Sequence, residues 1–370
     1  MGAEWAPMTS LLGLLTALLA SDGSTPPVTL LVAGDVTLGY HYEEFVDRLV
    51  ASGQAEAAAA GWGFDKVALV TERADLFLVN LECPFTRRGE KLPKNFNFRA
   101  RPELVGALAR GGVDVVSLAN NHLMDWGEDG LVDTLATLDA ARIRHFGAGR
   151  RLAEARKPVV LESKGVKVAF LGYFFLGERN IEPREVIATE AQPGVAGHFS
   201  DVGAMKTMLE ADIRAAKALA QHVVPFFHWG REGQGQVEPY QIELAHAAID
   251  AGASAVVGSH PHVLQGVELY RGAPIAYSLG NFVFGGNWDP KDKRAALLEL
   301  TFAGRGRPSA RLIPVLTDDS PTSPMQPFLA PDPKAGEILS LVATLSADFP
   351  STLEGLSRPR GPLPDGGVGR

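Results

Sequence analysis

Residues 253–262 read ASAVVGSHPH, a short apolar run that ends in two histidines separated by one proline. A run of this length, rich in Val and Ala and without charge, is typical of a buried β-strand. Side chains two residues apart in an extended or turn segment can face one cavity, and Pro261 stiffens the backbone between them. The stretch predicts a strand that delivers His260 and His262 to one point, although a turn with two structural histidines is the alternative.

Similar apolar runs precede this one along the chain, at residues 28–34, 74–79, 113–119, 166–173 and 222–227. Helical patterns alternate with them, at residues 102–110, around Leu131, Leu135 and Leu138, and at residues 239–252, where Pro opens and Gly closes the segment. Beyond residue 266, two pairs of apolar runs around short Gly-containing turns predict hairpins, at 266–279 and 295–315. The sequence therefore predicts an α/β fold with mixed β-sheets and flanking helices.

Polar side chains follow these apolar runs where each predicted strand ends. They are Asp35, Asn80, Glu82, Asn120, Asn121, His122 and His228, in addition to the two histidines at 260 and 262. In open α/β sheets, ligands bind beyond the carboxyl ends of the strands, so these side chains are expected in one crevice. A single histidine in such a place is usually structural, but four of the nine histidines lie at these ends beside carboxylates and an amide. This combination predicts a metal site.

The overall composition restricts the class of protein and the kind of metal site. The chain has 370 residues, 46% of them hydrophobic, which is enough for one large core. With 35 Lys and Arg against 43 Asp and Glu, the net charge of −8 disfavours nucleic acid as a partner. The single cysteine, Cys83, excludes an internal disulfide framework and a thiolate metal cluster, and we interpret it as a small buried apolar residue. Any metal must therefore be bound by nitrogen and oxygen.

The two ends of the chain differ in composition from the middle. Residues 11–20, LLGLLTALLA, are too few to span a bilayer, which takes about 20 residues, but they suit the core of a signal peptide. Glu4 and Leu18 depart from that pattern, so export and cytoplasmic retention both stay open, and no integral membrane span is expected. We divide the chain into a signal-like or disordered segment (1–27), a main domain (28–317), a Pro-rich connector with a C-terminal helix near 335–345 (318–356) and a mobile tail (357–370).

Several long strings carry a resemblance to a known family. They are AGDVTLG (33–39), LVNLECPFT (78–86), VDVVSLANNHLMDWGEDGL (113–131), HWGREGQ (228–234) and SHPHVLQGVELYRGAPIAYSLGNFVFG (259–285). In this order they resemble the CapA-type capsule-synthesis family, the poly-γ-glutamate capsule proteins, over about residues 28–315. The domain of that family is similar to the calcineurin-like metallophosphatase fold. The resemblance implies a layered sandwich of mixed β-sheets with flanking helices.

The resemblance also implies roles for the strand-end residues, carried over one by one. Asp35 and His262 would bind a first ion, Glu82 would be shared, and a second ion would be bound by Asn121, His228 and His260. His122 would face the substrate as a proton donor or oxyanion stabiliser, and Asn80 is a second candidate for the role of Glu82 or for its support. Thr37 stands where the phosphatases have a histidine, and Glu82 stands where they have an aspartate, so the first ion is expected to be weakly held or replaced by an oxygen-preferring cation. One or two divalent ions, manganese, iron or zinc, suit this set.

Other charged residues in these strings are candidates for the surroundings of the site. Glu232 could support a ligand or accept a proton, and Asp125 could orient His122. Lys94, Arg99 and Arg231 could contact an anionic substrate. For each of these residues, a solvated surface position or a structural ion pair is the alternative.

The expected function is metal-assisted hydrolysis or transfer at a phosphoryl or acyl centre, because paired ions polarise a substrate oxygen and activate water. The same cavity could instead support abstraction of a Cα proton, as in a peptide epimerase or lyase. A third possibility implied by the family is a polymer-binding or scaffold component of capsule synthesis or export that does not catalyse a reaction. The expected partner is an anionic polymer, or a peptide or phosphoester substrate. The natural substrate and the oligomeric state stay open.

Overall fold

The computed structural model describes residues 26–317 and 324–349. The signal-like run at residues 11–20 and the tail at 357–370 lie outside the described residues, as do both ends of the segment predicted at 318–356. Among the described residues, no helix is long and apolar enough to cross a membrane.

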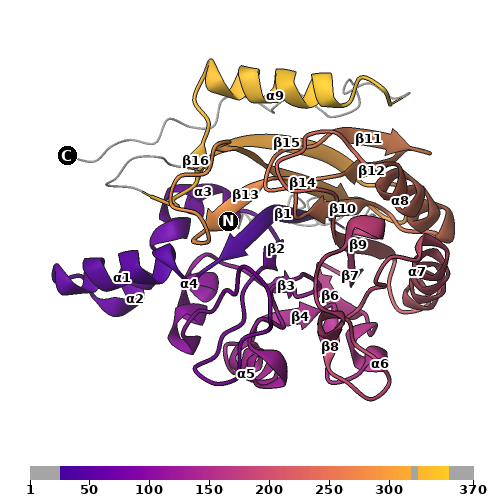
Figure 1. Ribbon diagram of the computed structural model, residues 1–370. Helices are drawn as coiled ribbons and strands as arrows, with labels where there is room; N and C mark the ends of the chain where they lie inside the picture. Colours follow the sequence, from indigo (N-terminus) through magenta and orange to yellow (C-terminus); the bar gives the residue numbers. More distant parts are fainter. Residues whose placement is uncertain (1–25, 318–323, 350–370) are drawn as a thin grey trace, which may run out of the picture.

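The first of two large sheets has eight strands and contains the beginning of the domain (Figure 1). Its order is β16-β15-β14-β1-β2-β3-β4, and β13 pairs with the end of β1. The strands β1 to β4 and β13 are parallel, whereas β14, β15 and β16 are antiparallel. Their bounds are β1 Val28–Thr37, β2 Leu76–Leu81, β3 Val115–Ser117, β4 Arg144–Phe146, β13 Asn281–Phe284, β14 Arg294–Phe302, β15 Ser309–Leu316 and β16 Phe328–Leu329.

The second sheet has six strands in the order β11-β12-β10-β9-β7-β6. The four inner strands are parallel, and the two edge strands, β6 and β11, are antiparallel to their neighbours. Their bounds are β6 Val159–Ser163, β7 Val166–Phe175, β9 His222–Trp229, β10 Val256–Ser259, β11 Val267–Tyr270 and β12 Ala273–Ala276. A separate two-stranded ribbon pairs β5 (Ala148–Gly149) with β8 (Gly194–Val195).

The helices cover the outer faces of the two sheets. Their bounds are α1 His41–Ala51, α2 Glu56–Ala60, α3 Ala68–Thr71, α4 Val105–Arg110, α5 Gly127–Ala140, α6 Leu152–Ala155, α7 Val202–Ala216, α8 Pro239–Ala251 and α9 Lys334–Leu345, with short 3₁₀ turns at Trp62–Val67, Pro102–Leu104, Gly177–Arg179 and Arg184–Val186. Helices α1, α4 and α5 share a core with the first sheet, and α7 and α8 share another with the second. A third core lies between the sheets and includes apolar residues of α9. The result is a sandwich of helix, sheet, sheet and helix layers, with α9 across one end (Figure 1).

Alternate residues of single strands belong to different cores, which explains why these strands are apolar throughout. In β1, Leu31 and Ala33 face the helix side, whereas Leu30 and Val32 face the second sheet. Successive side chains of a strand point to opposite faces, so a strand buried on both faces has no polar alternation. The predicted fold class, an α/β layered sandwich of mixed sheets, is confirmed, and so are the two predicted hairpins and the helix near 335–345.

The end of β1 passes unusually close to the turn before β13. A Cβ atom on Gly34 would lie 1.9 Å from the carbonyl oxygen of Gly280, and the adjacent Asp35 amide donates to that same oxygen at 3.2 Å. This contact needs a residue without a side chain, and it fixes the position of Asp35 at the end of the strand.

We expect Gly34→Ala to destabilise the protein by about 1–3 kcal/mol, because the added methyl group forces β1 and β13 apart. Gly106→Ala in α4 is a matched control, since a Cβ there meets no atom within 4 Å. It should be neutral or stabilise by up to about 1 kcal/mol. Chemical denaturation of both variants checks this, and equal stability of the two would contradict it.

Candidate metal centre

Residues at the ends of β1, β2, β9 and β10 are joined by hydrogen bonds across the two sheets. The amide of Asn80 on β2 donates to Asp35 on β1 at 2.8 Å and lies 3.3 Å from Nδ1 of His228 on β9. Nε2 of His228 in turn lies 2.9 Å from Nδ1 of His260, which directly follows β10. The sheets therefore meet at this edge, and the predicted convergence of strand-end side chains is what the structure contains.

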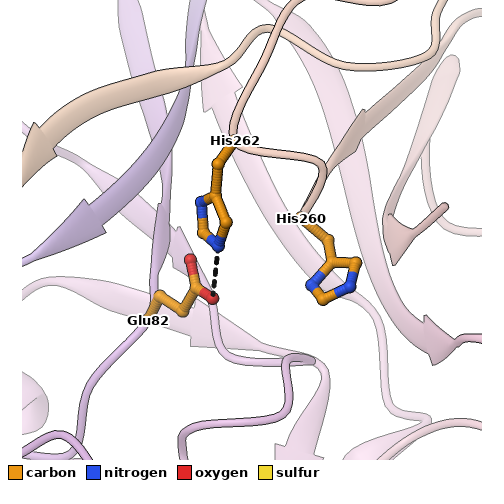
Figure 2. Close-up of side chains that lie close together, drawn as sticks. All are labelled: Glu82, His260 and His262. Carbon is orange, nitrogen blue, oxygen red and sulfur yellow. Dashed lines mark ion pairs between the residues drawn. The ribbon is translucent and has the colours of Figure 1, made fainter. Parts of the chain in front are cut away.

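Glu82 lies at the centre of this cluster with no hydrogen-bond partner among the described residues. Its side chain is fully buried, and neither carboxylate oxygen accepts a hydrogen bond. Oε1 lies 3.6 Å from Nε2 of His228, 3.9 Å from Nε2 of His262 and 4.0 Å from Nε2 of His122. Figure 2 shows the carboxylate facing the two rings that follow β10. A buried carboxylate that accepts no hydrogen bond is costly, so its surroundings are suited to a cation.

Candidate nitrogen and oxygen ligands in this cluster come from both sheets. Oδ1 of Asn121 lies 2.8 Å from Nε2 of His228, which also faces His260. Asn121 follows β3, so first-sheet and second-sheet residues share this cluster. This is the group predicted to bind the second ion.

Asp35 and His262 form a second pair of candidate ligands in contact with each other. Oδ2 of Asp35 is 3.3 Å from Nδ1 of His262 and also accepts the backbone amide of His260 at 3.3 Å. His260 and His262 both have positive φ, 97° and 57°, a strained conformation for residues with side chains. The turn predicted around Pro261 is therefore held in a conformation that directs both imidazoles inward.

The cluster contains two groups of three residues whose ligand atoms all lie within 4.8 Å of one another. One is Glu82 with His260 and His262, and the other is Glu82 with Asp35 and His228. These sets cross the predicted division between the two ions, but both contain Glu82. The carboxylate common to both sets is the residue predicted to be shared.

Burial and neighbouring charges shift the pKa values of these groups. It lowers the pKa of His260 to about 3 and that of His228 well below the usual histidine value, with further lowering from neighbouring histidines. Burial and the charge of Asp35 raise the pKa of Glu82 well above the usual range. For His262, burial is outweighed by the hydrogen bond and charge of Asp35, so its pKa is raised. His228 and His260 are thus neutral near pH 7, which leaves their lone pairs available to a metal.

These residues fit a divalent ion of the type predicted. The donors are carboxylate and amide oxygens and imidazole nitrogens, a mixed set that suits manganese, iron or zinc. The Glu82 carboxylate accepts no hydrogen bond from the described residues and lies among three imidazoles, so an ion there would supply a counter-charge. Thr37 stands at the position where the metallophosphatases have a histidine. Its side chain is buried, and its hydroxyl donates to the backbone oxygen of Glu82 at 3.1 Å.

His122 is held beside the cluster by the side chain predicted to orient it. Nδ1 of His122 lies 2.7 Å from Oδ2 of Asp125, and the ring is stacked against Phe98 at 4.1 Å between centroids. With Nδ1 hydrogen-bonded to a carboxylate, Nε2 is the nitrogen that faces Glu82. This arrangement leaves one ring nitrogen able to take or give a proton.

Lys94, a candidate substrate contact or member of a structural ion pair, lies between two carboxylates. Its side chain is only 8% exposed, and Nζ lies 3.0 Å from Asp125, 2.8 Å from Glu182 and 2.8 Å from the backbone oxygen of Asn121. Glu182 also accepts from the amide of Asn121 at 2.9 Å. Lys94 therefore connects the groups that support His122 and Asn121, which is a positioning role.

The other predicted substrate contacts are exposed. The Arg99 guanidinium lies over the Trp126 ring, 3.9 Å from its centroid. Arg231 and Glu232 line a cavity of about 610 Å³ that reaches His260. Apolar residues of the same cavity include Leu176, Val202 and Tyr240. A substrate in this cavity would lie next to the cluster, with Arg231 and Glu232 at its wall.

Three supporting residues were not among the predicted site residues. Ser259 lies 3.2 Å from Nδ1 of His228, Asn281 lies 2.9 Å from Nδ1 of His262, and Glu182 holds Asn121 and Lys94. Asn281 lies within the string at 259–285 that carries the family resemblance. No local pattern marks Glu182, because it comes from a loop and reaches the site only through the fold.

We expect the metal-free protein to lose stability as the pH falls from about 6.5 towards 3. His260 has its pKa lowered to about 3 on folding, so below the unfolded value of about 6.5 the unfolded state binds the extra proton. Each such proton costs about 1.4 kcal/mol per pH unit. His260→Gln should have a shallower slope of unfolding free energy between pH 7 and 5 than the wild type. Identical slopes for the two proteins would contradict the expectation.

Comparison with known proteins gives a consistent set of similarities. Residues 29–286 match the family model described as bacterial capsule synthesis protein PGA_cap. The chain is 32% identical over 305 residues to the capsule biosynthesis protein CapA of Bacillus anthracis, covering 80% of this chain and 69% of that protein. It is 29% identical over 296 residues to the PGA biosynthesis protein CapA of Bacillus subtilis, covering 79% and 72%. A solved 5′-nucleotidase from Candida albicans aligns with a TM-score of 0.41 at 10% identity, covering 86% of this chain and 57% of that one.

Proposed function

The chain belongs to the bacterial capsule synthesis protein family PGA_cap, and we propose that it is a metal-dependent enzyme that hydrolyses or transfers an acyl or phosphoryl group during synthesis of a poly-γ-glutamate capsule. The family supplies the biological setting through the names of its relatives. The chemistry is inferred from the cluster around Glu82.

The single observation that supports this proposal is the buried carboxylate of Glu82, without a hydrogen bond and surrounded by three imidazoles. Folding leaves such a group only where something offsets its desolvation, and a divalent ion does so. Asp35, Asn121, His228, His260 and His262 complete the ligand set that we propose. A structural histidine cluster would be expected to hydrogen-bond its carboxylate instead.

The remaining groups have separate roles in the proposed reaction. A divalent ion in this site would polarise the substrate oxygen and lower the pKa of bound water. His122, oriented by Asp125, would take or give a proton at Nε2. Lys94 and Glu182 would keep Asn121 and Asp125 in place. Arg231, at the wall of the cavity, would bind a carboxylate or phosphate of the substrate.

The test is to supply the purified protein with Mn²⁺, Fe²⁺ or Zn²⁺ and incubate it with γ-linked glutamate oligomers and with a phosphomonoester in deuterated water. The expected result is cleavage or transfer detected by mass spectrometry, lost after chelation and restored by adding the metal back. A Cα deuterium label without cleavage would replace hydrolysis with epimerase chemistry. Binding of the oligomer with no reaction of any substrate, while metal is bound, would replace it with a polymer-binding role.

A further inference from the structure

A second cavity, of about 630 Å³, lies where the edges of the two sheets approach each other. Its lining comes from the end of α5, the edge strand β4, the α6 region and the start of the edge strand β6. It shares no lining residue with the cavity beside His260. It is therefore a separate site.

The chain around this cavity is strongly basic in a protein that is acidic overall. Residues 142–157, RIRHFGAGRRLAEARK, contain six of the 35 Lys and Arg residues but one of the 43 acidic residues. Arg142, Arg144, His145 and Lys157 from this stretch line the cavity. We call this site the basic cavity.

The acidic residues that line the basic cavity already have partners. Asp139 pairs with His145 at 3.0 Å, and Glu154 pairs with Arg151 at 3.1 Å. In contrast, Arg142, Arg144 and Lys157 are exposed, and none of them forms an ion pair with a carboxylate in the described part of the chain. Three cationic groups are thus left to face an anion.

Arg142 stands where any residue other than glycine strains the backbone. It follows α5 with φ of 60°, and its amide donates to the Asp139 carbonyl, a helix ending at which glycine or asparagine is preferred. An arginine there costs local stability relative to glycine. A role for its charge would account for this choice.

We propose that the basic cavity binds a flexible polycarboxylate chain, and, resting on the proposed function, that this chain is the γ-linked glutamate polymer. Such a chain alternates carboxylates with methylene groups. The basic cavity offers matching chemistry, because Arg142, Arg144 and Lys157 lie beside apolar walls formed by Leu135, Ile143 and Val159. Exposed guanidinium and ammonium groups attract such a chain without a fixed geometry.

The other explanation is protective charge on edge strands. Lys and Arg on exposed edges prevent strands of two molecules from pairing. In that case the charges oppose self-association, and they have no preferred ligand. Polymer binding and self-association can be measured separately.

The experiment compares two triple variants of the full chain with the same change of net charge. The patch variant carries Arg142→Gly, Arg144→Ser and Lys157→Ser. The control variant carries Lys217→Ser, Lys291→Ser and Arg305→Ser, exposed residues that line no described cavity. Binding of a fluorescent γ-linked glutamate decamer is titrated by anisotropy at two salt concentrations, and each protein is also tested with inorganic polyphosphate.

We expect the patch variant to bind the decamer about tenfold more weakly and with less salt dependence, since three charge contacts are lost. The control variant should stay within about twofold of the wild type. Equal weakening in both variants, unchanged binding in the patch variant, or polyphosphate binding more than tenfold tighter than the decamer would each overturn the proposal. So would self-association of the patch variant without loss of binding.

Polymer binding at the basic cavity and catalysis at the metal site can be tested separately. Binding of the decamer by chelated, metal-free wild type would support the basic cavity even if no reaction is ever observed. Turnover of a short substrate by the patch variant should equal that of the wild type. Turnover without decamer binding would overturn the basic cavity and leave the metal site intact.

Discussion

Glu82→Gln is expected to abolish metal binding and turnover while making the metal-free protein more stable. The amide cannot supply the negative charge that the site needs for a cation, so turnover should fall by about 10³-fold or more. In the metal-free state the same change removes a buried carboxylate that accepts no hydrogen bond from the described residues. That should raise the free energy of unfolding by about 1–3 kcal/mol. With metal supplied, the variant should be less stable than the wild type, and with metal chelated it should be more stable. A residue with a purely structural role would change the free energy of unfolding in the same direction under both conditions.

The pH dependence of this gain follows from the direction of the pKa shift. Burial raises the pKa of Glu82 in the folded protein, so folding favours the protonated side chain. That contribution to stability is complete below the pKa of the unfolded state and is lost as the pH rises through the pKa of the folded state. The advantage of the Gln variant over the metal-free wild type should therefore grow with pH in that interval. Elemental analysis, turnover and calorimetry of chelated protein are the measurements. Bound metal and normal turnover in the variant would refute the assignment.

Asp125→Asn should lower turnover by about 10²–10⁴-fold while leaving the metal content unchanged. Asp125 accepts from Nδ1 of His122 at 2.7 Å and fixes the tautomer whose Nε2 faces the cluster. An amide in that place favours the wrong tautomer, so proton transfer is lost although the ligands remain.

A control variant on α5 and a double variant with His122 test whether Asp125 acts through His122. Glu128→Gln on the exposed part of α5 should keep full turnover. His122→Gln should match the Asp125 variant, and the double variant should lose little more, because both residues act as one unit. Loss of metal from the Asp125 variant, or additive losses in the double variant, would contradict the assigned roles.

Much of this fold could be predicted from local composition. The strands β1, β9 and β10 are buried on both faces. Their sequences therefore do not alternate apolar and polar residues, and this pattern can be identified without the structure. The position of Asp35 and His228 at strand ends is equally local. Local patterns alone, however, describe strands without stating which sheet each belongs to. The structure divides them between two sheets, because pairing order depends on contacts between residues far apart in the chain.

For the candidate site, too, some features follow from local sequence and others only from packing. The sequence determined which residues carry metal-binding chemistry, since residue type and position after a strand are local properties. Only the tertiary structure decided that Glu82 accepts no hydrogen bond from the described residues and that Lys94 is buried between Asp125 and Glu182. It also decided that basic residues of β4 and of the segment before β6 share a cavity. Each of these facts depends on distances between segments brought together by packing, and the free energy of a charged group depends on those distances and on its burial.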